Sequence, residues 1–346
     1  MELNLIPSTS MRRNLPRFLI LVASLCAFLE SKPPKFVVTP EVQGALEAIR
    51  PDPLRGGLSF LASDLLEGRN SPSRGLDIAA EYIAAQFRAA GLEAGGDDGY
   101  FQTARMAVTR PDLTGFELKL SHGERSLSVS ANDVSLRSSA GIELKNVPVF
   151  KLDLNDPGQV QALKPAEITG KAVLMELRRG AMRNYRAASQ KLRDGKPAVI
   201  LSIDPAAGEH TNGERLIDPE QPSSGLATIT LTIPSATAFS ASLKPGLSGA
   251  TASIHVAAPI QTPVRLRNVI GILRGSDPAL KDTAVLLTAH YDHLGQKPEG
   301  SGDRIYNGAN DDGSGTVSVI EIARALSMLK QHPRRSIVFM TFFGEE

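Results

Sequence analysis

The spacing of apolar residues divides the chain into three stretches. In residues 40–104 apolar side chains recur three and four positions apart, most clearly along Ile78–Phe87, which predicts a helix that ends near Gly91. Residues 112–258 instead carry short β-branched runs separated by proline and glycine, the pattern of strands and turns. One helix, around Met182–Leu192, is expected among them. The predicted strands of this stretch are Val147–Phe150, Ala172–Glu176, Ala198–Ile203 and Ala227–Ile233.

The third stretch begins after Pro263 and has the order strand, strand, helix, strand. The predicted elements are strands Asn268–Leu273, Thr283–Ala289 and Ser336–Phe343 and the helix Val317–Leu329. The last two strands are continuous apolar runs, which is typical of strands buried on both faces. We therefore predict an α/β fold with a mostly parallel central sheet and helices on both of its faces.

The change of pattern at two places predicts the domain organisation. With 346 residues the chain is long enough for two hydrophobic cores. We expect residues 40–110 and 262–346 to pack as one α/β domain. Residues 112–258 are expected to form a β-rich insert on its rim that contributes no strand to the central sheet.

The N-terminus, residues 1–31, has the pattern of a secretory signal peptide. Arg12, Arg13 and Arg17 precede the apolar run Phe18–Leu29. That run is shorter than the roughly 20 apolar residues that a membrane span needs. We expect a secreted or periplasmic protein with no stable membrane span after signal removal.

Cysteine usage and net charge exclude several classes of function. Cys26 is the only cysteine and lies within the predicted signal, so the mature protein would have neither disulfides nor thiolate metal ligands. Lipoprotein anchoring at Cys26 is not expected, because the bulky Leu25 precedes it. The formal net charge is +1, from 38 basic and 37 acidic residues, so no nucleic-acid partner is expected.

Three polar clusters follow the predicted strands or precede the predicted helix of the third stretch. They are Ala289–Gly295, Asn307–Gly315 and Phe342–Glu346. Ligands of open α/β sheets bind beyond the carboxyl ends of the strands, so the clusters should converge. Their histidines and carboxylates are the ligand types of zinc or a similar divalent ion. Gly313–Gly315 lacks the spacing of a serine nucleophile elbow.

The chain resembles the co-catalytic zinc aminopeptidases of metallopeptidase family 28, which include bacterial leucyl aminopeptidases and relatives of glutamate carboxypeptidase. The resemblance rests on His-Tyr-Asp-His-Leu-Gly at 290–295 and Gly-Ala-Asn-Asp-x-Gly-Ser-Gly at 308–315, and it extends to Leu58–Arg69 and Asn268–Gly271. The segment Ile168–Leu174 is similar to the protease-associated domain that many members carry as an insert.

The resemblance implies a site for two zinc ions. His290 would ligate one ion, Asp311 would bridge both and Glu346 would ligate the second. The peptide bond between Asp311 and Asp312 is expected to be cis. His293 matches no ligand position of the family and is interpreted as structural.

The same resemblance implies the catalytic roles. Glu345 would be the general base that takes a proton from water. Asp292 would hydrogen-bond the ring of His290 and fix its tautomer. The implied activity is hydrolysis of the N-terminal peptide bond of a peptide or protein substrate. Three alternatives stay open: a carboxypeptidase of the same family, a glutaminyl cyclase, and a non-catalytic binding or receptor-like relative.

The resemblance also implies a further aspartate and a further histidine ligand from downstream segments, which the 346 residues do not supply. We therefore expect a C-terminally truncated chain that by itself binds zinc poorly and is inactive. The presence of His290, Asp311, Glu345 and Glu346 nevertheless favours an enzyme over a decayed relative.

Overall fold

A computed structural model describes residues 38–177, 180–204, 212–221, 225–297 and 299–346. The predicted signal peptide, residues 1–31 with Cys26, lies outside these residues. Within them, none of the helices is long and apolar enough to cross a membrane. The described residues divide into two units, one that ends at Ile49 and one that begins at Arg50. The first contains helix α2 (Pro40–Ala48), which begins where the Thr39 hydroxyl accepts a hydrogen bond from the Val42 amide.

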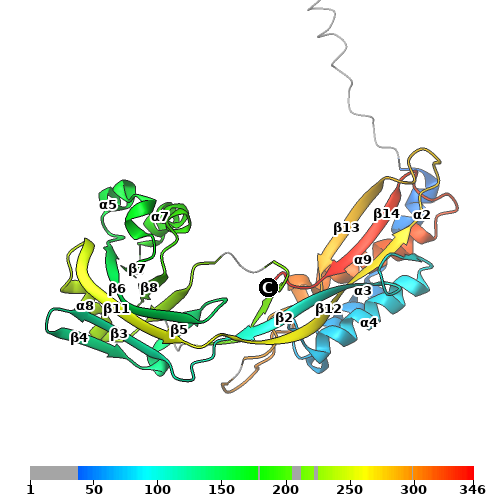
Figure 1. Cartoon of the computed structure of the whole chain (residues 1–346). Helices are drawn as coiled ribbons and strands as arrows, with labels where there is room; N and C mark the ends of the chain where they lie inside the picture. The colour runs from blue at the N-terminus through cyan, green and yellow to red at the C-terminus, as the bar shows by residue number, and fades with distance from the viewer. Residues whose placement is uncertain (1–37, 178–179, 205–211, 222–224, 298) are drawn as a thin grey trace, which may run out of the picture. The chain divides into compact units, whose positions relative to one another are not determined.

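The strands of the third stretch of the sequence lie in a six-stranded sheet (Figure 1). Its order is β13-β14-β12-β2-β9, and β1 pairs with β12. β13 and β14 run parallel, whereas β12 is antiparallel to its three neighbours and β9 is antiparallel to β2. The strands are β1 (Glu93–Ala94), β2 (Phe101–Arg110), β9 (Arg215–Ile217), β12 (Ile260–Leu273), β13 (Ala284–His290) and β14 (Ser336–Phe342).

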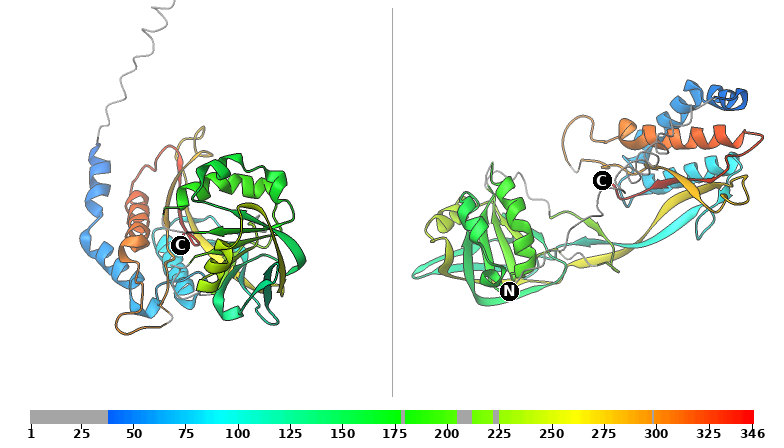
Figure 2. Two further views of the ribbon diagram at one scale, coloured as in Figure 1. Left: turned by 90° about the vertical axis from the view of Figure 1, so that its left-hand side faces the viewer. Right: turned by 90° about the horizontal axis from the view of Figure 1, so that it is seen from above.

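Three helices lie against one face of this sheet: α3 (Pro51–Leu61), α4 (Arg74–Ala89) and α9 (Ser314–Ser327) (Figure 2). Their apolar sides and the facing strands form one core. At its centre the rings of Phe87 on α4 and Phe339 on β14 lie 6.4 Å apart, and both side chains are fully buried. Both predicted helices of this domain are confirmed, although each begins a few residues earlier than the apolar spacing indicates.

The predicted α/β class is confirmed, but two details of the sheet were wrong. Among the described strands of this sheet only β13 and β14 form a parallel pair. The chain leaves along β2 and returns along β12, which makes that pair antiparallel. The described helices cover one face, and on β13 the side chains of Val285 and Leu286 are 48% and 58% exposed. These exposed side chains show that β13, which pairs with β14 alone among the described strands, is not buried on both faces.

An eight-stranded sheet is built from the middle stretch, in the order β4-β3-β11-β6-β7-β8-β10-β5. The predicted strands and the helix α7 (Met182–Gly195) are all present. The stretch has more helix than predicted, because α5 (Pro157–Ala162), α6 (Pro165–Ile168) and α8 (Pro234–Ala241) are too short to produce an apolar period. The strands are β3 (Glu117–His122), β4 (Arg125–Val129), β5 (Val134–Arg137), β6 (Ile142–Leu152), β7 (Ala172–Glu176), β8 (Val199–Ile203), β10 (Thr228–Leu231) and β11 (Gly246–Val256).

One strand of the middle stretch joins the other sheet, contrary to prediction. β9 pairs with Ala107–Thr109 of β2 and thereby takes up the edge that β12 leaves free. A three-residue strand has too few positions to show alternation, so the sequence carries no signal for it. The boundaries proposed for the insert, residues 112–258, remain a prediction.

Candidate metal centre

The parallel pairing of β13 and β14 brings two of the three polar clusters together. His290 is the last residue of β13 and lies opposite Phe342, the last residue of β14. The Tyr291 amide then donates to the Phe342 carbonyl at 2.9 Å, which keeps the two emerging segments side by side. Glu345 and Glu346 therefore follow β14 next to the histidine cluster, as the sequence predicts.

The third cluster reaches the same place through the start of α9. The Thr316 hydroxyl, near the start of α9, donates to the His290 carbonyl at 2.9 Å. Just before this helix, Ala309–Gly313 form a kinked turn, η3, in which Asp311 and Asp312 have non-helical backbone angles. The bond between Asp311 and Asp312 is cis, which confirms the prediction.

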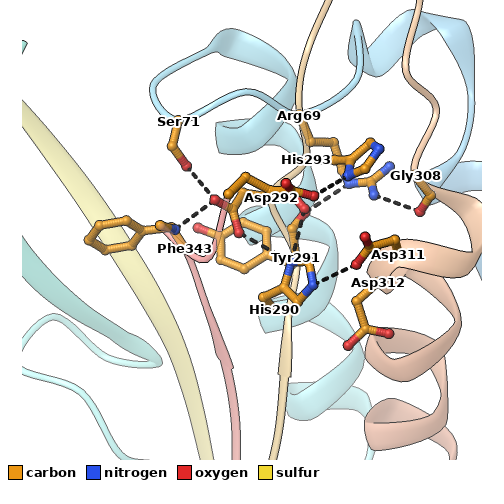
Figure 3. A network of polar contacts seen from close by, with 12 residues as sticks. Arg69, Ser71, His290, Tyr291, Asp292, His293, Gly308, Asp311, Asp312 and Phe343 are labelled. Carbon is orange, nitrogen blue, oxygen red and sulfur yellow. Dashed lines mark hydrogen bonds and ion pairs between the residues drawn. The ribbon is translucent and has the colours of Figure 1, made fainter. Parts of the chain in front are cut away.

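The predicted ligands lie close together. Nε2 of His290 is 3.0 Å from Oδ1 of Asp311, and the two side chains point toward each other in Figure 3. Asp311 also belongs to a second group, because one ligand atom each from His293, Asp311 and Glu346 lie within 4.8 Å of one another. Asp311 is thus next to both groups, which is the place that a bridging ligand needs.

His293 was interpreted as structural from the sequence, yet the structure places it among the candidate ligands. Its Nδ1 is 2.5 Å from Oε1 of Glu346, and its side chain is 11% exposed. The sequence did contain a signal for this role, because His293 is a second histidine three residues after His290 and beyond the end of the same strand. It was set aside because the family resemblance assigns no ligand to that position.

Asp292 is fully buried behind the ring of His290. Its Oδ2 accepts hydrogen bonds from the Ser71 hydroxyl at 3.0 Å and from the Gly344 amide at 2.6 Å. Its Oδ1 lies 3.5 Å from Nδ1 of His290 and has no hydrogen-bond partner. Asp292 therefore ties the His290 loop to the segment that leads into Glu345.

The hydrogen bond that fixes the ring of His290 differs from the expected one. Nδ1 lies 3.3 Å from the main-chain oxygen of Asp292, closer than the carboxylate that the resemblance implied. The carboxylate is held back because its other oxygen is occupied by Ser71 and Gly344. A carbonyl oxygen only accepts, so Nδ1 carries a hydrogen. Nε2 faces a carboxylate oxygen of Asp311, which also only accepts, so Nε2 donates to it unless a bound metal ion takes the place of that hydrogen.

Electrostatics at the site favour a cation. Burial lowers the pKa of His290, but the charge of Asp292, the hydrogen bond to Asp311 and the charge of Asp312 outweigh it, so the pKa is raised. The same carboxylates that stabilise an imidazolium would stabilise a metal ion. Imidazole and carboxylate ligands are the donor set of zinc when thiolates are absent. The residues present therefore fit a zinc site, with the unpartnered Oδ1 of Asp292 directed at the ring of a ligand.

Arg69 is a part of the site that the sequence did not reveal as functional. Its guanidinium is fully buried and donates to four main-chain carbonyls, those of Leu61, Tyr291, Asn307 and Gly308. Figure 3 shows it among the site residues. Arg69 lies in the Leu58–Arg69 segment on which the resemblance partly rests, but nothing in that segment indicates its partners.

Comparison with known proteins supports the sequence resemblance. The family model described as peptidase family M28 matches residues 268–346. A probable zinc metalloprotease of Leptosphaeria maculans is 38% identical over 92 residues, which are 26% of this chain and 20% of that protein. The predicted resemblance to this family is therefore confirmed over residues 268–346. The chain spans about a fifth of the length of this relative.

Two solved structures are also similar. An aminopeptidase from Aneurinibacillus sp. strain AM-1 is 19% identical, with a TM-score of 0.47, and the match covers 88% of this chain and 65% of that one. A peptidase M28 precursor from Shewanella amazonensis SB2B is 17% identical, with a TM-score of 0.42, and the match covers 88% of this chain and 67% of that one.

Proposed function

We propose that this chain carries the metal-binding part of a secreted aminopeptidase that hydrolyses N-terminal peptide bonds with two zinc ions. The observation that carries the proposal is that Asp311 contacts His290 and also lies within 4.8 Å of ligand atoms of His293 and Glu346. One carboxylate shared by two sets of ligands is the arrangement that a two-metal site requires.

The residues divide the chemistry among them. Zinc bound at these ligands would lower the pKa of a water molecule and polarise the scissile carbonyl. Glu345 would accept a proton from the attacking water and deliver it to the leaving amine. Asp292 keeps His290 in place and, through the Gly344 amide, places the segment that carries Glu345. Glu345 is itself exposed and thus accessible to a substrate.

A matched pair of variants tests the roles of the two carboxylates. The protein, as its gene encodes it, is purified, dialysed and assayed for zinc content and for hydrolysis of leucine 4-nitroanilide. Glu345→Gln should retain zinc and lose turnover by a factor of about 10²–10⁴, because only proton transfer is removed. Asp311→Asn should lose zinc as well as turnover. Full activity of Glu345→Gln would show that the base is another group.

The aminopeptidase type has a separate test. A peptide with a free N-terminus should be shortened one residue at a time from that end, whereas its N-acetylated copy should stay intact. Internal cleavage of the acetylated peptide would instead indicate an endopeptidase.

Secretion is proposed from the signal-like segment at residues 1–31. A strain that expresses the gene should release a protein whose first residue lies shortly after this segment, which N-terminal sequencing would identify. Recovery of the uncleaved chain from the cytoplasm would refute the proposal.

A further inference from the structure

We infer that Arg69 is a positioning residue that holds the two ligand-bearing loops, 290–295 and 307–313, in the arrangement that binds metal. The inference rests on the proposed zinc site and adds a residue that touches neither metal nor substrate.

The four hydrogen bonds of the guanidinium bind three separate segments to one another. Nε donates to the Tyr291 carbonyl at 2.8 Å, between His290 and Asp292. Nη1 donates to Asn307 at 2.7 Å and to Leu61, and Nη2 donates to Gly308 at 2.9 Å. One side chain thus fixes the loop of His290 against the loop that leads into Asp311. Only arginine has donors spread over a rigid plane that can reach four carbonyls at once.

The main chain around Arg69 serves the same loops. The Arg69 carbonyl accepts from the His293 amide at 3.1 Å, and the Gly68 carbonyl accepts from the Gly295 amide at 3.0 Å. Glu67, Gly68 and Arg69 all adopt left-handed conformations, with φ of 51°, 71° and 50°. Such a run is uncommon and costs free energy, so its surroundings must compensate for it.

The ligand loop is shaped to admit the guanidinium. Gly308 has φ of 58°, and a Cβ there would lie 2.6 Å from Nη2 of Arg69, from the Asp311 carbonyl and from Cγ of His293. The Asn307 side chain adds a second connection, since it donates to the Ala62 carbonyl at 2.9 Å. Both Arg69 and the loop 307–313 are therefore shaped for this close contact.

Its charge is suited to a site that gathers carboxylates. Burial lowers the pKa of Arg69, and the nearby charges of Asp292 and Asp312 oppose that shift. Arginine stays protonated in proteins, so the guanidinium is a fixed positive charge behind the ligands. This charge stabilises the buried carboxylate of Asp292. Because the guanidinium donates only to main-chain carbonyls, the side-chain ligand atoms can still face a metal.

The test uses the full protein and the variants Arg69→Met and Arg69→Lys, with Arg267→Met as the matched control. Arg267 is a partly buried arginine of the same domain, but its side chain pairs with Glu81 and Asp77, at 2.7 and 3.4 Å. Its one bond to the loops runs from the Tyr291 hydroxyl to its main-chain carbonyl, which the substitution keeps. Zinc affinity is measured by competition with a chelator. Hydrogen exchange is measured in the metal-free protein for two amides of the loops, that of His293 and that of Gly313, which donates to the Gly308 carbonyl at 3.0 Å.

We expect both Arg69 variants to bind zinc about 10- to 100-fold more weakly than the parent, and both amides to exchange faster. Arg267→Met should change neither. Arg69→Lys keeps the charge and should fold if Arg69→Met does not, because a lysine can still donate to one or two of the carbonyls. A folded Arg69 variant with the zinc affinity of the control would overturn the inference.

Failure of the proposed function would look different. A parent protein that retains no zinc would refute the metal site, and the inference would fall with it even if the amides exchange faster. A parent that binds zinc, with Arg69 variants that bind it equally well, would refute the inference alone.

Discussion

The replacement Asp292→Asn isolates the contribution of one buried charge to metal binding. The amide has nearly the same volume as the carboxylate, and its oxygen can still accept the hydrogen bonds from Ser71 and Gly344. The lost feature is the negative charge whose Oδ1 lies 3.5 Å from Nδ1 of His290. Partners of this kind typically contribute 10- to 100-fold to metal affinity, so we expect a loss of about 1.4–2.7 kcal/mol in zinc binding.

The assay compares zinc affinity, by chelator competition at fixed pH, with the unfolding free energy of the metal-free protein. Ser71→Ala is the control, because it removes one hydrogen bond to the same carboxylate and keeps the charge. It should change zinc affinity much less than Asp292→Asn does. Zinc affinity of Asp292→Asn within about threefold of the parent would refute the reasoning, since the charge would then have no effect on the ligand ring.

Two further substitutions test how the site and its core are built. Gly308→Ala should lower the free energy of unfolding by more than the roughly 1 kcal/mol expected from its left-handed backbone alone. The control in chemical unfolding is Gly123→Ala, because Gly123 has a similar φ of 59° and open space around it. Equal losses of stability in the two variants would show that the close approach of Arg69 to Gly308 is unimportant. Phe339→Ala should destabilise the protein by about 3–5 kcal/mol, because its ring is fully buried, whereas Phe60→Ala, which is 38% exposed, should cost much less. A small loss at Phe339 would mean that the core collapses into the cavity.

The sequence determined the elements whose signal is local. β7 spans Ala172–Glu176 as predicted, and β14 is a buried strand, because runs of apolar residues specify such strands without knowledge of their neighbours. The convergence of His290, Asp311 and Glu346 was also predictable, since each follows a strand or precedes a helix and such ends meet at one edge of a sheet.

Only the tertiary structure decided how strands pair and which side chains meet across long separations. β9 joins β2, and β13 is left half exposed, because strand order depends on which edges are free and not on the strand's own residues. Arg69 contacts Tyr291, 222 positions away, and donates to main-chain carbonyls, which every residue has, so no side-chain pattern announces the contact. His293 likewise reaches Glu346 only because β13 and β14 run parallel and end together. The sequence specifies the ligand types, and the packing of loops beyond the strand ends selects which of them face one another.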